Sequence, residues 1–180
     1  MTDGARARRV VVAAASRHGS TADIAARIEG TIREHLASGW VVETVDVSDL
    51  RSFEDADAVV LGSAVYLGRW MRPAVKALHF VKDESLLDLW LFSTGPVSDD
   101  VRENESVITA DEMVAKGHAT EHMVFAGRLD PSRLAWWERL TLRIVGAVAG
   151  DRRDWAAVDA WAISIAGQLA DAPSTTEHRS

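Results

Sequence analysis

The stretch VVVAAASRHGSTADIA (residues 10–25) contains the pattern that decides the fold. Its first six residues are apolar without interruption, which is typical of a short strand buried on both faces. A polar loop follows over residues 16–21. Beyond it, apolar residues recur every four positions and predict an amphipathic helix, at Ile24, Ile28, Ile32 and Leu36. Strand, short loop and helix in this order open a βαβ unit, so the stretch predicts a parallel sheet.

The same alternation continues along most of the chain. Further strands are predicted over residues 41–47, 57–62, 87–92 and 123–126, in addition to the first strand at 9–15. Helices are predicted from about Pro73, around residues 109–116, and after Asp154, which is a good N-cap. The last helix carries an apolar stripe at Trp155, Val158, Ala162, Ile165 and Leu169. Continuous apolar strands separated by helices indicate an α/β fold with a doubly wound parallel sheet.

One domain over residues 9–170 accounts for this pattern, with flexible ends at 1–8 and 171–180. A bare five-stranded sheet leaves over the segment 131–150, which is predicted to be a helical insert. Its apolar stripe lies at Leu134, Trp137, Leu140, Ile144 and Val148. Two interpretations remain open, because Trp136, Leu142 and Val145 fall off the stripe. The first is core packing with a protein-partner or homodimer contact, and the second is peripheral docking at a membrane.

Composition excludes several function classes. The 180 residues carry a formal net charge of −7, which disfavours nucleic acid as the main partner. The absence of cysteine excludes a disulfide scaffold, a thiolate nucleophile and a cysteine-ligated metal. No apolar run reaches the roughly 18 residues of a membrane span, so we expect a cytoplasmic protein. His118 and His122 are interpreted as solvated residues of a connection, and no metal site is expected.

Polar residues follow the first strand, where doubly wound sheets bind their ligands. Hydroxyls, a glycine and a helix start combine there into a candidate anion site, formed by Ser16, Arg17, His18, Gly19, Ser20 and Thr21. An ordinary capped helix with Ser20 or Thr21 as N-cap explains these residues equally well. Neither a G-x-x-x-x-G-K-[ST] nor a G-x-G-x-x-G motif occurs, which argues against P-loop nucleotide and dinucleotide binding.

Two further loops are expected at the same edge. The first follows the third strand, and its small residues would let a planar ring approach; its members are Ser63, Ala64, Val65 and Tyr66. The second follows the fourth strand with Thr94, Gly95 and Pro96. Trp70 is interpreted as buried packing rather than a ligand contact, because tryptophan more often serves that role.

At this point the chain resembles the flavodoxin-like superfamily. The resemblance rests on VVVAAASRHGSTADIA (10–25), DADAVVLGSAVYLGRW (55–70) and WLFSTGP (90–96), and it implies a five-stranded sheet of order 2-1-3-4-5. Flavodoxins hold the FMN phosphate in a T/S-x-T-G-x-T loop. Ser16, Gly19 and Thr21 match that loop, whereas His18 replaces a hydroxyl. FMN is therefore the implied cofactor, with its phosphate at residues 16–21 and its ring beside residues 63–66 and 94–96.

The pattern is most similar to flavodoxin domains of the menaquinone-dependent protoporphyrinogen oxidase type. LAWWERLTLRIVGAVAGDRRDWAAVDAWA (134–162) corresponds to the insert and last helix of that group. The resemblance implies an FMN-dependent oxidoreductase with a quinone or a protein as redox partner, and protoporphyrinogen oxidation as the candidate reaction. The alternative is a non-enzymatic electron carrier, or a flavodoxin-like binding module with a degenerate FMN site. No catalytic side chain is assigned.

Overall fold

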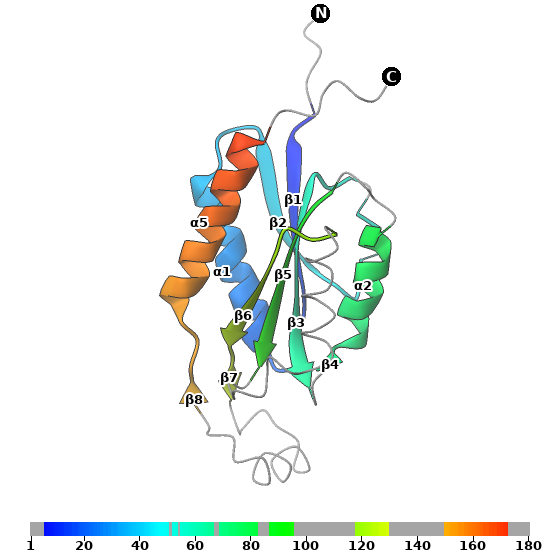
Figure 1. Ribbon diagram of the computed structural model, residues 1–180, viewed down its shortest axis with the longest axis vertical. Helices are drawn as coiled ribbons and strands as arrows, with labels where there is room; N and C mark the ends of the chain where they lie inside the picture. Colours follow the sequence, from blue (N-terminus) through cyan, green and yellow to red (C-terminus); the bar gives the residue numbers. More distant parts are fainter. Residues whose placement is uncertain are drawn as a thin grey trace, which may run out of the picture.

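Five parallel strands form the central sheet of this protein (Figure 1). They are β1 (Arg8–Ala15), β2 (Trp40–Asp46), β3 (Ala58–Tyr66), β5 (Asp88–Gly95) and β6 (Glu121–Ala126). The computed structural model describes residues 6–50, 52–53, 55–66, 69–82, 87–95, 118–129 and 150–172. The sheet order is β2-β1-β3-β5-β6, which is 2-1-3-4-5 when these five strands are counted along the chain. The predicted α/β architecture and strand order are confirmed.

Helices cover both faces of the sheet. Helices α1 (Ser20–His35) and α5 (Trp155–Asp171) lie side by side on one face, and α2 (Arg72–Lys82) lies on the other (Figure 1). The predicted stripe of α1 is fully buried at Ile24, Ile28 and Ile32. The stripe of α5 is likewise buried from Val158 to Leu169, and Asp154 caps that helix by accepting a hydrogen bond from the Ala157 N–H. Periodicity in the sequence therefore located both faces of the core.

Two strands extend further than their apolar cores predict. The third predicted strand, 57–62, continues in β3 to Tyr66, and the fourth, 87–92, continues in β5 to Gly95. Parallel pairing explains the extension, because Ser63 is in register with Ser93 and Ala64 with Thr94. Residues expected in loops, from Ser63 to Tyr66 and at Thr94 and Gly95, therefore lie at strand ends. Their backbones are fixed by the sheet.

Three short strands were not predicted. Strand β4 (Arg69–Trp70) pairs antiparallel with the end of β3, and β7 (Arg128–Leu129) pairs antiparallel with β8 (Gly150–Asp151). The β7–β8 ribbon joins the two ends of the segment predicted as a helical insert. That insert up to residue 149, the helix predicted at 109–116, residues 1–5 and 173–180, and Pro96 lie outside the described residues. Within the described part of the chain, no helix is long and apolar enough to cross a membrane.

Candidate cofactor site

The candidate site lies at the edge of the sheet where the parallel strands end. Register places Ala15 beside Ser63, and Ala64 beside Thr94. Three chain segments that follow or end β1, β3 and β5 are therefore neighbours in space, although they are far apart in the sequence. Figure 1 shows this edge at the lower end of the sheet, where α1 also begins. The topology thus gathers the predicted site residues that the structure describes.

Gly19 sets the geometry of the first loop. It is the N-cap residue of α1, with φ 89° and ψ −18°, a left-handed conformation that glycine adopts without steric cost. The prediction that Ser20 or Thr21 is the N-cap is wrong, because both residues already belong to the helix. The N–H of Gly19 donates to Ser16 Oγ at 3.1 Å and closes the loop over three residues. The turn delivers the chain directly into the first turn of α1.

The hydroxyl groups of α1's first turn tie this loop to its neighbours. Ser20 Oγ accepts a hydrogen bond from the Arg128 N–H at 2.8 Å, and Thr21 Oγ1 lies 2.6 Å from Thr94 Oγ1. Thr21 is buried, so its hydroxyl connects the end of β5 to the start of α1 inside the protein. Ser16 and Ser20 both accept through oxygen, and each retains a hydroxyl hydrogen that it can donate to another group.

An anion fits this arrangement. A helix that begins at Ser20 leaves the N–H groups of its first turn without intrahelical acceptors, and its dipole is positive at that end. The donor hydroxyls of Ser16 and Ser20 stand beside these N–H groups. Arg17 is exposed in the same loop, and His18 is half-buried with its ring edge-on to Tyr66, at 6.2 Å between ring centroids. Phosphate is the anion for which such helix starts are commonly used.

The ends of β3 and β5 supply the second part of the site. Tyr66 is 37% exposed, whereas Ala64 and Val65 are almost entirely buried. Ser63 is fully buried, and its hydroxyl accepts from the Met71 N–H at 2.9 Å. Gly95 packs its backbone towards Val65, and a Cβ there would lie 3.6 Å from Val65 Cβ. Ser63 and Val65 are therefore buried residues that fix the strand ends, whereas the aromatic ring of Tyr66 is at the surface.

A buried polar chain lies beneath these strand ends. Trp70 Nε1 donates to Ser93 Oγ at 2.8 Å, and Ser93 Oγ lies 2.9 Å from His122 Nε2. Trp70 is 5% exposed, which confirms its interpretation as core packing. His122 is a half-buried residue of β6, so its interpretation as a solvated loop residue is wrong. The apolar run MVFA (123–126) predicted only the last part of this strand, because the polar residues Glu121 and His122 resemble a connection in the sequence.

A second group of charges surrounds Asp23 in the first turn of α1. Arg153 is only 6% exposed; its guanidinium donates to Asp23 at 2.8 Å and to Asp151 through two nitrogens, and it stacks over Trp155. These bonds to Arg153 lower the pKa of Asp151 to about 2. Sequence spacing gave no signal for this cluster, because α1 and β8 are brought together only by the fold. Among the described residues, no group of three potential ligands could hold a metal ion.

The sequence profile of the flavodoxin domain family matches residues 11–155 of this chain. The chain belongs to the flavodoxin domain family. No curated protein matches the sequence. Membership of the family implies FMN as the cofactor, and it places this flavodoxin domain among FMN-binding electron-transfer folds.

Solved structures agree with this assignment at the level of the fold. A flavodoxin from Streptococcus pneumonia TIGR4 is 14% identical with a TM-score of 0.60, and the match covers 89% of this chain and 99% of that one. A flavodoxin from the domain Archaea is 16% identical with a TM-score of 0.57, covering 89% and 98%. The Flv1 flavodiiron core from Synechocystis sp. PCC6803 is 14% identical with a TM-score of 0.59 over 92% of this chain. This flavodoxin domain spans only 37% of that protein.

The residues present fit FMN. Its terminal phosphate needs donors and a close backbone approach, and Gly19 with the first turn of α1 supplies both. Its flat ring needs a neighbouring aromatic surface and small residues, which Tyr66, Ala64 and Gly95 offer at two adjacent strand ends. His18 replaces a hydroxyl of the usual phosphate loop, but Ser16, Ser20 and the backbone N–H groups keep the donor character of the site.

Proposed function

We propose that this flavodoxin domain is an FMN-dependent oxidoreductase. In this proposal Ser16, Arg17, His18, Gly19, Ser20 and Thr21 surround the phosphate of FMN. The ring lies against residues 63–66 on one side and Thr94, Gly95 and Pro96 on the other. When bound, FMN supplies the electron and hydride chemistry. The chain binds the cofactor, orients its ring and limits the access of water.

One observation supports this proposal more than any other. The left-handed Gly19 begins α1 at the C-terminal edge of the sheet, with the hydroxyls of Ser16 and Ser20 already polarised by backbone donors. Because its N-cap residue Gly19 has no side chain, α1 has no side-chain cap hydrogen bond, and no side chain of the cap accepts from its first-turn N–H groups. Ser16 and Ser20 each accept from a backbone N–H, so among the described residues their hydroxyl hydrogens can be directed to an external acceptor. A phosphate satisfies them together with the first-turn N–H groups.

The substrate proposed is protoporphyrinogen, with electrons passing to a quinone such as menaquinone. Support comes from the similarity of residues 134–162 to protoporphyrinogen oxidase-type flavodoxin domains. A cytoplasmic location, with a peripheral membrane contact or a homodimer contact through residues 131–150, belongs to the same proposal. If the chain instead carries electrons between proteins, the cofactor site stays the same and only the acceptor differs.

Two measurements test the proposal in sequence. The purified protein should be yellow, absorb blue light, and quench FMN fluorescence when the apoprotein is titrated at micromolar concentration. The FMN-loaded protein should then form fluorescent protoporphyrin from protoporphyrinogen under anaerobic conditions when a menaquinone analogue is added. Failure to bind FMN would contradict the cofactor site. Binding of FMN without protoporphyrin formation would reject the substrate and favour the electron carrier.

A further inference from the structure

Three basic residues follow the end of β3 along the chain, namely Arg69, Arg72 and Lys76. Arg69 is in register with Tyr66 across the β3–β4 pair, and Arg72 is the first residue of α2. The start of α2 is held at the site, because the Met71 N–H donates to the Ser63 hydroxyl. Lys76 lies one turn further along the helix. In a chain with a formal net charge of −7, Arg69 is thus the cation paired with the exposed Tyr66, and Arg72 and Lys76 follow it along the chain.

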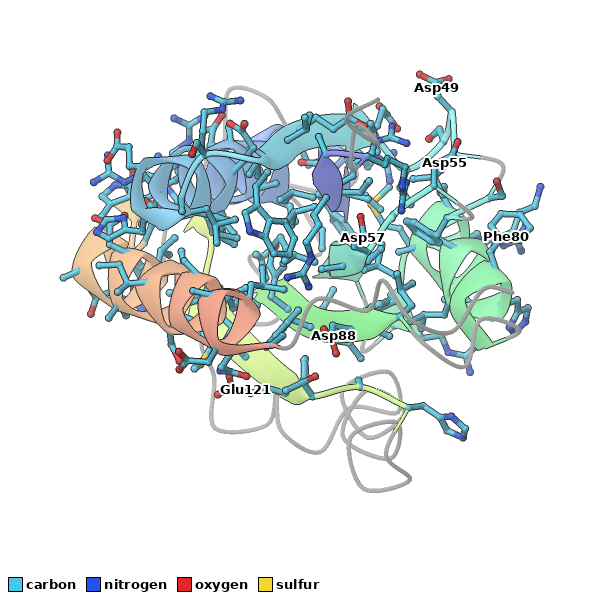
Figure 2. The ribbon with its side chains drawn as sticks, turned by 90° about the horizontal axis from the view of Figure 1, so that it is seen from above. Asp49, Asp55, Asp57, Phe80, Asp88 and Glu121 are labelled. Atoms are coloured by element: carbon cyan, nitrogen blue, oxygen red, sulfur yellow. The ribbon has the colours of Figure 1, made fainter. Side chains whose placement is uncertain are left out.

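Two of these cations have no carboxylate partner in the part of the chain that the structure describes. Arg72 and Lys76 are both exposed, and Lys76 Nζ lies 5.8 Å from the ring centroid of Phe80. Other arginines of this protein are paired: Arg27 binds Asp159, and Arg6 binds Asp57. Figure 2 shows Asp57, Asp88 and Glu121 near the opposite edge of the sheet, where β3, β5 and β6 begin. Among the described residues, Arg72 and Lys76 thus have no carboxylate that neutralises them, and Arg72 begins α2 on the cofactor side.

A hollow of about 290 Å³ lies directly beside Arg72 and Lys76, and we call it the α2 groove. One wall is α2, with Arg72, Pro73, Lys76 and Phe80. The other wall is the chain that follows β2, with Val47, Ser48 and Leu50. Apolar residues thus line both walls of the groove, and two cations line the α2 wall. Asp46 and Asp49 belong to the chain of the other wall, so the charge of the groove is asymmetric.

The shape and charge of the α2 groove indicate what binds there. An apolar hollow flanked by cations is complementary to an apolar side chain surrounded by carboxylates. Arg69, Arg72 and Lys76 extend from the end of β3 to the second turn of α2, which is a span suited to a protein surface. Contact that includes Arg69 would bring the partner to the end of β3, where Arg69 pairs with Tyr66 and where the flavin ring is proposed to lie.

We propose that the α2 groove, together with Arg69, is the docking surface for an acidic redox-partner protein. This inference rests on the proposed FMN-dependent function, because the partner would exchange electrons with the cofactor at this edge. Arg72 and Lys76 would steer an acidic partner towards this edge and accelerate its association at low ionic strength. Their effect would weaken as salt screens the charges.

The test uses an acidic plant-type ferredoxin, labelled with a dye, as the probe. Its dissociation constant is measured by fluorescence anisotropy against the full chain, with and without FMN, from about 10 mM to about 300 mM salt. The variant Arg72→Glu/Lys76→Glu should weaken binding by about tenfold or more at low salt, because like charges then face each other. Arg152→Glu, which reverses an exposed arginine outside the groove, should change the constant by less than about twofold.

FMN loading, read from absorbance, separates the two levels of the inference. If the chain takes up no FMN but binds the probe through Arg72 and Lys76, the proposed function is contradicted and the docking surface is supported. A chain that loads FMN but binds the probe equally well in all variants, or not at all at low salt, overturns the docking surface. Flotation with phosphatidylglycerol vesicles that is lost in the double variant would assign the groove to a lipid surface, which also overturns the proposal.

Discussion

Gly19 adopts a left-handed backbone conformation in the candidate cofactor site that other residues rarely adopt. Its φ of 89° costs an alanine about 1–2 kcal/mol, and the strain falls on the loop proposed to hold the phosphate. Gly19→Ala should therefore weaken FMN binding by about tenfold, measured by fluorescence titration. Gly39→Ala is the matched control, because Gly39 has φ 106° but follows α1 far from the loop. That variant should lose similar stability and keep its FMN affinity; equal losses of affinity would contradict the role of Gly19.

Gly62 is required for a different reason, namely space. A Cβ at this position would lie 2.0 Å from the ring of Phe92, which is fully buried between the sheet and α5. Gly62→Ala should lower the free energy of unfolding by about 2–3 kcal/mol, measured by urea denaturation. Gly30→Ala makes the same substitution in the middle of α1, where nothing lies within 4 Å. It should raise stability by about 0.5–1 kcal/mol, so opposite signs are expected from one chemical change.

These two glycines also show what the sequence reveals about single residues. The importance of Gly19 was predicted, because a glycine before a helix start and between hydroxyls suggests close backbone approach. The importance of Gly62 was not, because it depends on Phe92, which is thirty positions away and reaches β3 only through sheet pairing. His122 is a similar case: its partner Ser93 lies on the neighbouring strand. Local patterns cannot identify such pairs.

At the level of elements, the ionic contacts of β8 with α1 make a testable contribution to stability. Arg153 holds the pKa of Asp151 at about 2, below its ordinary value of 3.8. A depressed carboxylate pKa stabilises the folded state above the unfolded pKa, and this contribution is lost as the pH falls towards 2. Arg153→Gln should therefore make the free energy of unfolding fall less steeply between about pH 5 and pH 2. Urea denaturation at several pH values measures this slope, and an unchanged slope would contradict the assignment.

Arg152→Gln is the control for that experiment. Arg152 is the exposed neighbour of Arg153, and the same charge is removed without breaking the bonds to Asp23 and Asp151. Its slope should match that of the wild type. Because the Asp151 carboxylate is 45% exposed, water screens the pair and the effect will be modest.

Element existence and type were predicted better than element ends. Apolar residues in runs of strand length located all five parallel strands, and the periodic stripes located α1 and α5. The polar residues Ser63, Ser93 and Thr94 hid the ends of β3 and β5, since in a single sequence they look like loop residues. In the fold they are buried hydrogen-bonding groups with partners on β4, α1 and β6. Polar satisfaction by distant partners is the information that periodicity lacks.

At the level of the whole molecule, the identity of the bound flavin tests the site as a unit. The loop at residues 16–21 is proposed to hold one terminal phosphate, and no acidic residue follows a glycine fingerprint to bind an adenosine ribose. Denaturation of the purified protein should therefore release FMN, identified by chromatography. Release of FAD alone would contradict the site. Added FMN at about a hundredfold excess over its dissociation constant should raise the free energy of unfolding by about 2.7 kcal/mol, and riboflavin by less, since it lacks the phosphate.

The pairing of β7 with β8 brings together the two residues that flank the segment 130–149, namely Leu129 and Gly150. Arg128 pairs with Asp151 and Leu129 pairs with Gly150, so an antiparallel pair of short strands connects the two ends of this segment. The length and sequence of the segment between β7 and β8 can therefore change in evolution without changing the register of the central sheet. Replacing residues 130–149 by Asn-Gly, the preferred two-residue hairpin turn, should yield a chain that still folds and binds FMN, as circular dichroism and flavin titration would show. Loss of folding would mean that residues 130–149 are required for the stability of the domain.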